Sequence, residues 1–242
     1  MPAEAGEEAR ARMLELFPQG FEEAGDDTLE LAAYTDEDGE ARARAVFGRV
    51  ESKPVEPGWE DRWREFHRPV RIGPLWIGPP WETPDPDALA VVIDPGQAFG
   101  TGAHATTRLC LELLLDLEPA SLVDLGCGSG VLAIAAAKLG FDPVTALDAD
   151  PVAVEAAVAN ARVNGARMTV EQADVLAGEL PEAGVAVANI ELAAVEALAG
   201  RVLAPVLLTA GYLAVDPLAP AGWRSTARLE RDGWAADRFE PA

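Results

Sequence analysis

The ten residues Ser-Leu-Val-Asp-Leu-Gly-Cys-Gly-Ser-Gly, at positions 121–130, constrain the fold more than any other stretch. A short apolar run ends in Asp124, and three glycines then follow at alternate positions. Residues 131–139 are strong helix formers, and Gly140 after them is typical of a helix C-terminus. Because glycine lacks a Cβ, such a loop can turn sharply and lie against a ligand. The stretch therefore predicts a strand, a glycine loop and a helix.

A second predicted strand, over residues 143–148, ends in Asp148, 22 residues after Gly126. An acidic residue at this distance accepts hydrogen bonds from ribose hydroxyls, which predicts a nucleoside-bearing cofactor. The glycines are spaced G-x-G-x-G, whereas dinucleotide sites use G-x-G-x-x-G with pyrophosphate on the helix N-terminus. Asp124 ahead of the glycines favours a ligand with a cationic end over a pyrophosphate.

The chain after residue 140 continues to alternate predicted strands with predicted helices. We predict strands over 143–148, 167–171, 184–190 and 205–211, and helices over 151–164 and 191–203. Two further predicted strands, over 223–230 and 234–240, are joined at Arg-Asp-Gly and indicate a hairpin. This order predicts the α/β class, with a Rossmann-like sheet that ends in an antiparallel C-terminal hairpin.

The first third of the chain has a different character. Residues 1–53 are predicted to be a small α+β domain, with helices over 4–16 and 40–47 and strands over 21–24, 28–35 and 49–53. Its role is either to recognise a substrate or to act as a scaffold. Residues 54–86 are predicted to be a linker with a short helix, whose Trp59, Trp63 and Phe66 would pack one aromatic face between two domains. A strand is predicted over 71–77, and a second domain over 87–242.

A second glycine-rich stretch precedes the first. An apolar strand ends at Asp94, and the following loop contains Gly96, Gly100, Gly102 and a histidine, His104. We predict that Thr106 or Thr107 caps a helix over 108–117. A loop so rich in glycine is costly to order, which indicates that something binds it.

Charge and cysteine content exclude several classes of function. The 242 residues carry a net charge of −22, which argues against direct nucleic-acid binding. This charge favours a basic protein partner or else reflects an acidic proteome. The two cysteines, Cys110 and Cys127, suggest neither a disulfide framework nor a metal site. With no apolar run of membrane-spanning length, we expect a soluble cytoplasmic monomer.

The two glycine-rich stretches together resemble the ribosomal protein L11 methyltransferase family. The matching motifs are D-P-G-Q-A-F-G-T-G-A-H-A-T-T at 94–107 and D-L-G-C-G-S-G at 124–130, supported by W-R-E-F-H at 63–67 and L-W-I-G-P-P-W at 75–81. The resemblance implies a class I methyltransferase domain over 87–242 that uses S-adenosyl-L-methionine. It also implies N-methylation of amino groups of ribosomal protein L11, on lysine side chains or the N-terminus.

The resemblance assigns roles to individual residues. Cofactor contacts are expected from Gly100, Thr101, Thr107, Asp124, Gly126, Gly128, Asp148, Asp174 and Asn189. Phe99, His104 and Asn189 are the expected catalytic residues: Asn189 would orient the amine, and the loop over 99–107 would close over the methionine end with His104 inside. Asp174 would bind the adenine amino group, or alternatively would be a solvated loop residue.

Three other interpretations stay open at this point. A dinucleotide-dependent oxidoreductase would share the strand–loop–helix pattern but not the glycine spacing. A cofactor-binding module without catalysis would not need the stretch from Asp94 to Thr107 or Asn189. A methyltransferase of the same fold could act on another protein lysine or on a small amine.

Overall fold

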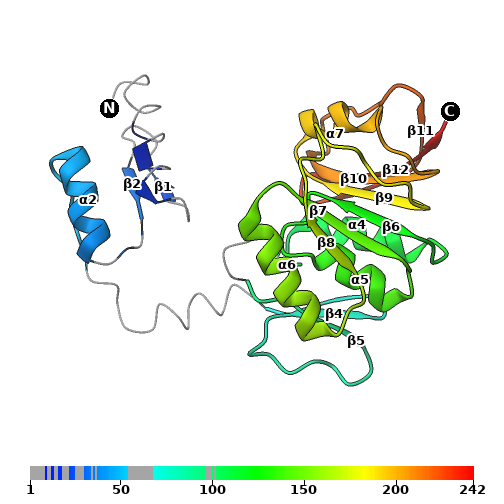
Figure 1. The fold of residues 1–242 in the computed structure, drawn as a ribbon, viewed down its shortest axis with the longest axis horizontal. Helices are drawn as coiled ribbons and strands as arrows, with labels where there is room; N and C mark the ends of the chain where they lie inside the picture. The colour runs from blue at the N-terminus through cyan, green and yellow to red at the C-terminus, as the bar shows by residue number, and fades with distance from the viewer. Residues whose placement is uncertain are drawn as a thin grey trace. The chain divides into compact units, whose positions relative to one another are not determined.

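The computed structural model describes residues 9, 12–13, 16–17, 22–24, 30–33, 35, 37–53, 68–95, 100 and 102–242. The chain divides into two compact units, Met1–Glu60 and Asp61–Ala242. Figure 1 shows the elements of each unit. The predicted aromatic helix face at Trp59, Trp63 and Phe66 lies outside the described residues. Among the residues that are described, no helix is long and apolar enough to cross a bilayer.

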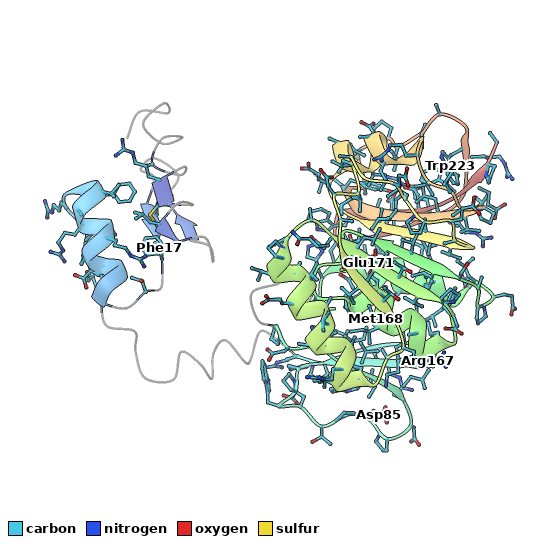
Figure 2. The ribbon with its side chains drawn as sticks, viewed as in Figure 1. Phe17, Asp85, Arg167, Met168, Glu171 and Trp223 are labelled. Atoms are coloured by element: carbon cyan, nitrogen blue, oxygen red, sulfur yellow. The ribbon has the colours of Figure 1, made fainter. Side chains whose placement is uncertain are left out.

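The smaller unit is an α+β arrangement. Strand β1 (Glu22–Ala24) pairs antiparallel with β2 (Glu30–Ala32), and helix α2 (Glu37–Phe47) follows. The described positions of the predicted N-terminal helix, 9, 12–13 and 16, are helical. The buried core of the smaller unit consists of Met13, Phe17 and Ala43, of which Figure 2 labels Phe17. The predicted strand over 49–53 is wrong: these residues have no regular structure, and their single apolar side chain, Val50, gives them little to bury.

The larger unit contains a seven-stranded sheet in the order β11-β12-β10-β9-β6-β7-β8. Its strands are β6 (Leu122–Leu125), β7 (Val144–Asp148), β8 (Thr169–Gln172), β9 (Val185–Asn189), β10 (Val206–Leu213), β11 (Trp223–Arg231) and β12 (Trp234–Pro241). The five neighbouring strands β10, β9, β6, β7 and β8 are parallel to one another. Strand β12 pairs antiparallel with both β10 and β11. The predicted Rossmann-like sheet with a C-terminal hairpin is confirmed.

Four helices cover this sheet: α4 (Ala105–Leu115), α5 (Val131–Leu139), α6 (Pro151–Asn164) and α7 (Leu192–Ala199). The predicted ends of α5 and α6 are confirmed, because Gly140 and Gly165 are left-handed and the Asp150 carboxylate accepts a hydrogen bond from Val152 N. Helix α7 ends four residues before the predicted limit. Trp223 donates from Nε1 to the Ala199 carbonyl at 2.9 Å, joining the C-terminal hairpin to α7 (Figure 2).

A second, three-stranded sheet was not predicted. It consists of β3 (Val70–Ile72), β4 (Leu75–Gly78) and β5 (Leu89–Val92), with β3 antiparallel and β5 parallel to β4. The predicted linker over 54–86 is therefore incorrect in its second half, and the predicted strand over 71–77 is two strands. A turn separates them at Gly73, whose φ of 52° suits glycine. The Arg71 guanidinium pairs with the Asp85 carboxylate beside this turn (Figure 2).

Helices α4 and α5 lie between the two sheets (Figure 1). Six of the nine residues of α5, Val131 to Ala136, are buried, and α4 buries eight of its eleven. Helices that are apolar on every side must be covered on every side. The small sheet supplies that cover: Ile72, Leu75, Ile77, Val91 and Ile93 belong to the same core cluster as these helices.

Connections leave β6 and β9 in opposite directions along the sheet, since β6 leads through α5 to β7 and β9 leads through α7 to β10. The two strands are neighbours and parallel. In open α/β sheets, ligands bind at such a switch point, outside the carboxyl ends of the strands. The fold therefore brings the glycine loop after β6 and Asn189 at the end of β9 to one place.

Strand β10 carries a bulge opposite this place. Its register with β12 shifts between Ala210 and Tyr212, and Gly211 between them has a φ of 102°. A Cβ on Gly211 would lie 2.1 Å from the Ile190 carbonyl oxygen. The bulge thus lets β10 approach the residue that follows Asn189.

We predict that Gly211→Ala destabilises the protein by roughly 3 kcal/mol or more, because the new methyl group would overlap backbone that cannot move aside and φ would be strained. Gly200→Ala is the matched control, since nothing lies within 4 Å of its added Cβ. Urea unfolding followed by circular dichroism measures both. Equal losses for the two variants would contradict the tight contact at Ile190.

Candidate active site

The glycine loop folds back on the end of β7. Gly126 N and Cys127 N both donate to the Leu147 carbonyl, at 2.8 and 3.0 Å. Gly126, Gly128 and Gly130 have φ values of 82°, 53° and 79°. A Cβ on Gly126 would lie 2.5 Å from the Ile190 side chain. The alternate glycines are therefore required by backbone conformation and, at Gly126, by space.

Asp148 is held by the backbone around it. One carboxylate oxygen accepts from Gly128 N at 2.8 Å, and the other accepts from Asp150 N at 3.0 Å. The side chain is half-buried at the carboxyl end of β7. Each oxygen keeps a second lone pair, so the carboxylate is oriented and can still accept hydrogen bonds from a ligand.

Asp124 is fully buried, with 1% of its surface exposed. Its Oδ2 accepts from Ala133 N at 3.2 Å in the first turn of α5, whereas its Oδ1 has no partner among the described residues. Burial raises the pKa of Asp124 to about 7; the bond from Ala133 acts against this rise, and the charge of Asp148 adds to it. A buried oxygen without a donor is costly. A cationic or N–H-bearing ligand group beside Oδ1 would remove that cost.

The second side of the candidate site is built from β9 and α4. Asn189 Nδ2 donates to Thr107 Oγ1 at 3.4 Å, and Thr107 is fully buried. The predicted capping of α4 by Thr106 or Thr107 is wrong, since the helix begins earlier, at Ala105. His104 is the N-cap residue, and its Nδ1 accepts from Thr106 N at 3.4 Å. The His104 imidazole nitrogen therefore takes the capping role that a serine or threonine hydroxyl usually has. Thr106 and Thr107 cannot take it, because they already lie inside the first turn of α4.

The other predicted residues are placed as follows. Asp174 is exposed, and its Oδ1 accepts from Leu176 N at 2.9 Å. The preceding residue, Ala173, donates from its N to the Asp148 carbonyl at 2.8 Å, which sets Asp174 beside Asp148. Gly100 accepts a hydrogen bond from the Ser129 hydroxyl. Phe99 and Thr101 lie outside the described residues. Burial raises the pKa of the Cys110 and Cys127 thiols, so neither provides a thiolate.

Comparison with known proteins identifies the family. The family model for ribosomal protein L11 methyltransferase (PrmA) matches residues 10–218. The chain belongs to the ribosomal protein L11 methyltransferase family.

Individual relatives agree with this assignment. A ribosomal protein L11 methyltransferase from Shewanella sediminis is 46% identical over 177 residues, covering 66% of this chain and 56% of that protein. One from Vibrio campbellii is 49% identical over 158 residues, covering 62% of this chain and 50% of that protein. The chain spans about half the length of the curated relatives it matches.

Solved structures agree on the fold. A crystal structure of the ribosomal protein L11 methylase from Lactobacillus delbrueckii subsp. bulgaricus superposes with a TM-score of 0.65 at 26% identity, covering 72% of this chain and 99% of that one. The putative RNA methyltransferase PH1948 from Pyrococcus horikoshii superposes with a TM-score of 0.50 at 21% identity, covering 60% and 87%. The second likeness shows the fold alone.

Three residues of this L11 methyltransferase family member escaped sequence analysis. Trp234, at the start of β12, packs edge-on against His104 with ring centroids 4.9 Å apart. Ser129 and Asn160 hydrogen bond to the segment that precedes α4. A signal was present for Asn160, because it and Asn164 are amides four residues apart on the face of α6 that also carries buried alanines. No local sequence signal pointed to Trp234, because its contact with His104 joins residues 130 positions apart.

We predict that Asp124→Asn changes stability in a pH-dependent way. The pKa of Asp124 is raised in the folded state, so the native protein loses stability as pH rises from about 4 to about 7 and stays at the lower value above that. Removing the buried charge should therefore stabilise the protein at pH 8, by at most about 4 kcal/mol, and change little near pH 4.

Urea unfolding at the two pH values measures this difference. Asp87→Asn serves as the control, because Asp87 is exposed in the loop before β5. If Asp124→Asn shifted stability equally at pH 4 and pH 8, the buried carboxylate would not titrate as described.

Proposed function

We propose that this protein is an S-adenosyl-L-methionine-dependent N-methyltransferase that methylates amino groups of ribosomal protein L11. This proposal rests on the buried Oδ1 of Asp124, which has no hydrogen-bond partner among the residues that the structure describes. It marks a place for a cationic group under the glycine loop, where a dinucleotide would bring the negative charge of a pyrophosphate. Membership of the L11 methyltransferase family supports the choice of reaction and substrate.

The residues present fit the cofactor. Asp124 would receive the ammonium group of its methionine end, and Asp148 would accept from the ribose hydroxyls. Asp174, beside Asp148, would accept from the adenine amino group. The backbone of Gly126 and Gly128 would contact the ligand directly. Gly100, Thr101 and Thr107 would contact it from the opposite side of the cofactor. When bound, S-adenosyl-L-methionine supplies a methyl group already activated by its attachment to a sulfonium.

The chain's own residues would prepare the amine. A lysine ammonium with a pKa of about 10.4 in water must lose a proton before it can act as a nucleophile. Burial beside a positive charge favours the neutral amine. Asn189 donates from Nδ2 to Thr107, which leaves Oδ1 to accept an N–H from the amine and aim its lone pair. His104 and Phe99 would close this space and exclude water.

The partner would be a basic protein in the cytoplasm. The net charge of −22 would attract such a protein over a distance, and salt would weaken the attraction. We assign substrate recruitment to the unit Met1–Glu60, which has a core of its own. Methylation of another protein lysine or of a small amine is the alternative.

We predict that Asp148→Ala weakens S-adenosyl-L-methionine binding by roughly 2–4 kcal/mol, or about 30- to 1000-fold, because two charge-assisted hydrogen bonds are lost. Isothermal titration calorimetry gives the dissociation constant, with Asp87→Ala as the exposed control and circular dichroism as the check on folding. Unchanged affinity would remove Asp148 from the cofactor site.

The substrate proposal is tested with labelled cofactor and purified ribosomal protein L11. We expect the full chain to transfer label to L11, and residues 61–242 to bind cofactor normally but to label L11 far more slowly, because positioning is lost while the chemical site remains. Label on another lysine-rich protein but not on L11 would establish the alternative substrate instead.

A further inference from the structure

Ser129, in the glycine loop, forms a hydrogen bond with the segment between β5 and α4. It is buried, with 1% of its surface exposed. Its hydroxyl donates to the Gly100 carbonyl and accepts from Val131 N at 3.4 Å. A Cβ on Gly100 would lie 3.2 Å from Ser129 Oγ, which is a tight contact, and the φ of Gly100 is 101°, a conformation that favours glycine. The hydroxyl thus links Gly100 to the first turn of α5.

The other end of the same segment reaches Ser129 through Asn160. Asn160 Nδ2 donates to the Ser129 carbonyl at 3.0 Å, and Asn160 Oδ1 accepts from Asp94 N at 3.2 Å. Asn160 is 4% exposed, so both bonds are shielded from water. Asp94 and Gly100, six residues apart, are therefore fastened to one residue of the glycine loop.

Asn164 fixes the strand that leads into this segment. Its Oδ1 accepts from Val92 N at 2.8 Å, and its Nδ2 donates to Val92 O at 2.7 Å and to Asn160 O at 2.8 Å. The amide gives Val92 the pair of bonds that a neighbouring strand would give. Helix α6 therefore holds both β5 and the start of the segment, and Asn164 also steadies Asn160.

We propose that Ser129 and Asn160 are positioning residues that fix the β5–α4 connection on the cofactor loop, so that cofactor binding and the placement of this connection are energetically coupled. The inference rests on the proposed cofactor site and adds residues that act through it. Gly102 shows why the placement matters. A Cβ there would lie 2.4 Å from the Ile77 side chain and 3.6 Å from that of Val131, so Gly102 lies tightly between β4 and the start of α5, two residues before the N-cap His104.

The coupling follows from reciprocity. A ligand that lies on the glycine loop and favours the arrangement with the Ser129–Gly100 bond also stabilises the connection, and loosening the connection weakens ligand binding to the extent that it depopulates this arrangement. Through His104 and Thr107 the connection sets the substrate side of the site. The buried Ser129 hydroxyl therefore couples the cofactor side of the site to its substrate side.

The test compares Ser129→Ala with the control Ser121→Ala. Ser121 precedes β6, and its hydroxyl accepts from Gly184 N at 2.8 Å, so each change removes one serine hydroxyl that bonds to the backbone of a distant segment. Hydrogen exchange of peptides covering 93–104 and 223–241 is measured with and without S-adenosyl-L-homocysteine. Calorimetry gives the affinity for the same ligand, and thermal unfolding gives the global stability.

We expect Ser129→Ala to speed exchange of the 93–104 peptide about tenfold, corresponding to one lost buried hydrogen bond. Ligand affinity should fall by the fraction of the bonded arrangement that is lost, and bound ligand should slow exchange of this peptide in the unaltered protein. The 223–241 peptide should be unaffected. Ser121→Ala should change neither the 93–104 exchange nor the affinity. A merely structural role for Ser129 would instead speed exchange in both peptides and lower the unfolding temperature.

Other outcomes overturn the inference. Unchanged exchange of the 93–104 peptide in Ser129→Ala would show that the hydroxyl does not hold the connection, and equal exchange of that peptide with and without ligand in the unaltered protein would show that the two are not coupled. If Ser129→Ala fails to fold, Asn160→Ala, which frees the Asp94 end, takes its place with the same expectations. No binding of S-adenosyl-L-homocysteine by the unaltered protein would refute the proposed cofactor, while the exchange without ligand still tests the fastening itself.

Discussion

The burial of α4 and α5 between two sheets is the constraint on which the rest of this structure depends. A helix such as Val131–Leu139, which is apolar on every side, must be covered on every side, and the three-stranded sheet β3-β4-β5 provides the second cover. That sheet delivers the chain to the start of α4 at the carboxyl edge of the large sheet. At this edge Gly100, from the second glycine-rich stretch, meets Ser129 of the first.

Electrostatics gives this edge its chemical preference. Asp124 is buried, and within the described part of the chain one of its oxygens has no partner while the other accepts from Ala133 N. Among these residues, only that one bond offsets the desolvation of the carboxylate. Such a group is costly unless a ligand completes it. A positive ligand group would do so, and a pyrophosphate would add repulsion from Asp124 and Asp148. The same carboxylate that destabilises the protein above pH 7 would thus favour a ligand that brings a cationic group, such as an ammonium, to Oδ1.

Local sequence signals predicted much of the fold, and long-range contacts explain what they missed. Local sequence signals predicted the N-cap at Asp150 and the helix ends at Gly140 and Gly165. They also predicted the succession of strands along the chain from residue 122 onward. Residues 70–78 were predicted as one strand within a linker and not as part of a sheet, because their burial depends on helices that begin only at Ala105. At the site, the glycine loop and Asp148 were predicted from their spacing. His104 as a cap, Trp234 and the Ser129–Asn160 bonds depend on approaches between distant segments that no local pattern encodes.

The proposed cofactor requires the strand–glycine loop–helix of this chain to bind an S-adenosyl compound and not a dinucleotide. Calorimetric titration of the full chain at pH 8 with S-adenosyl-L-methionine and, separately, with NAD distinguishes the two. We expect saturable binding of one equivalent of S-adenosyl-L-methionine and no heat from NAD. Saturable binding of NAD that S-adenosyl-L-methionine fails to displace would contradict it.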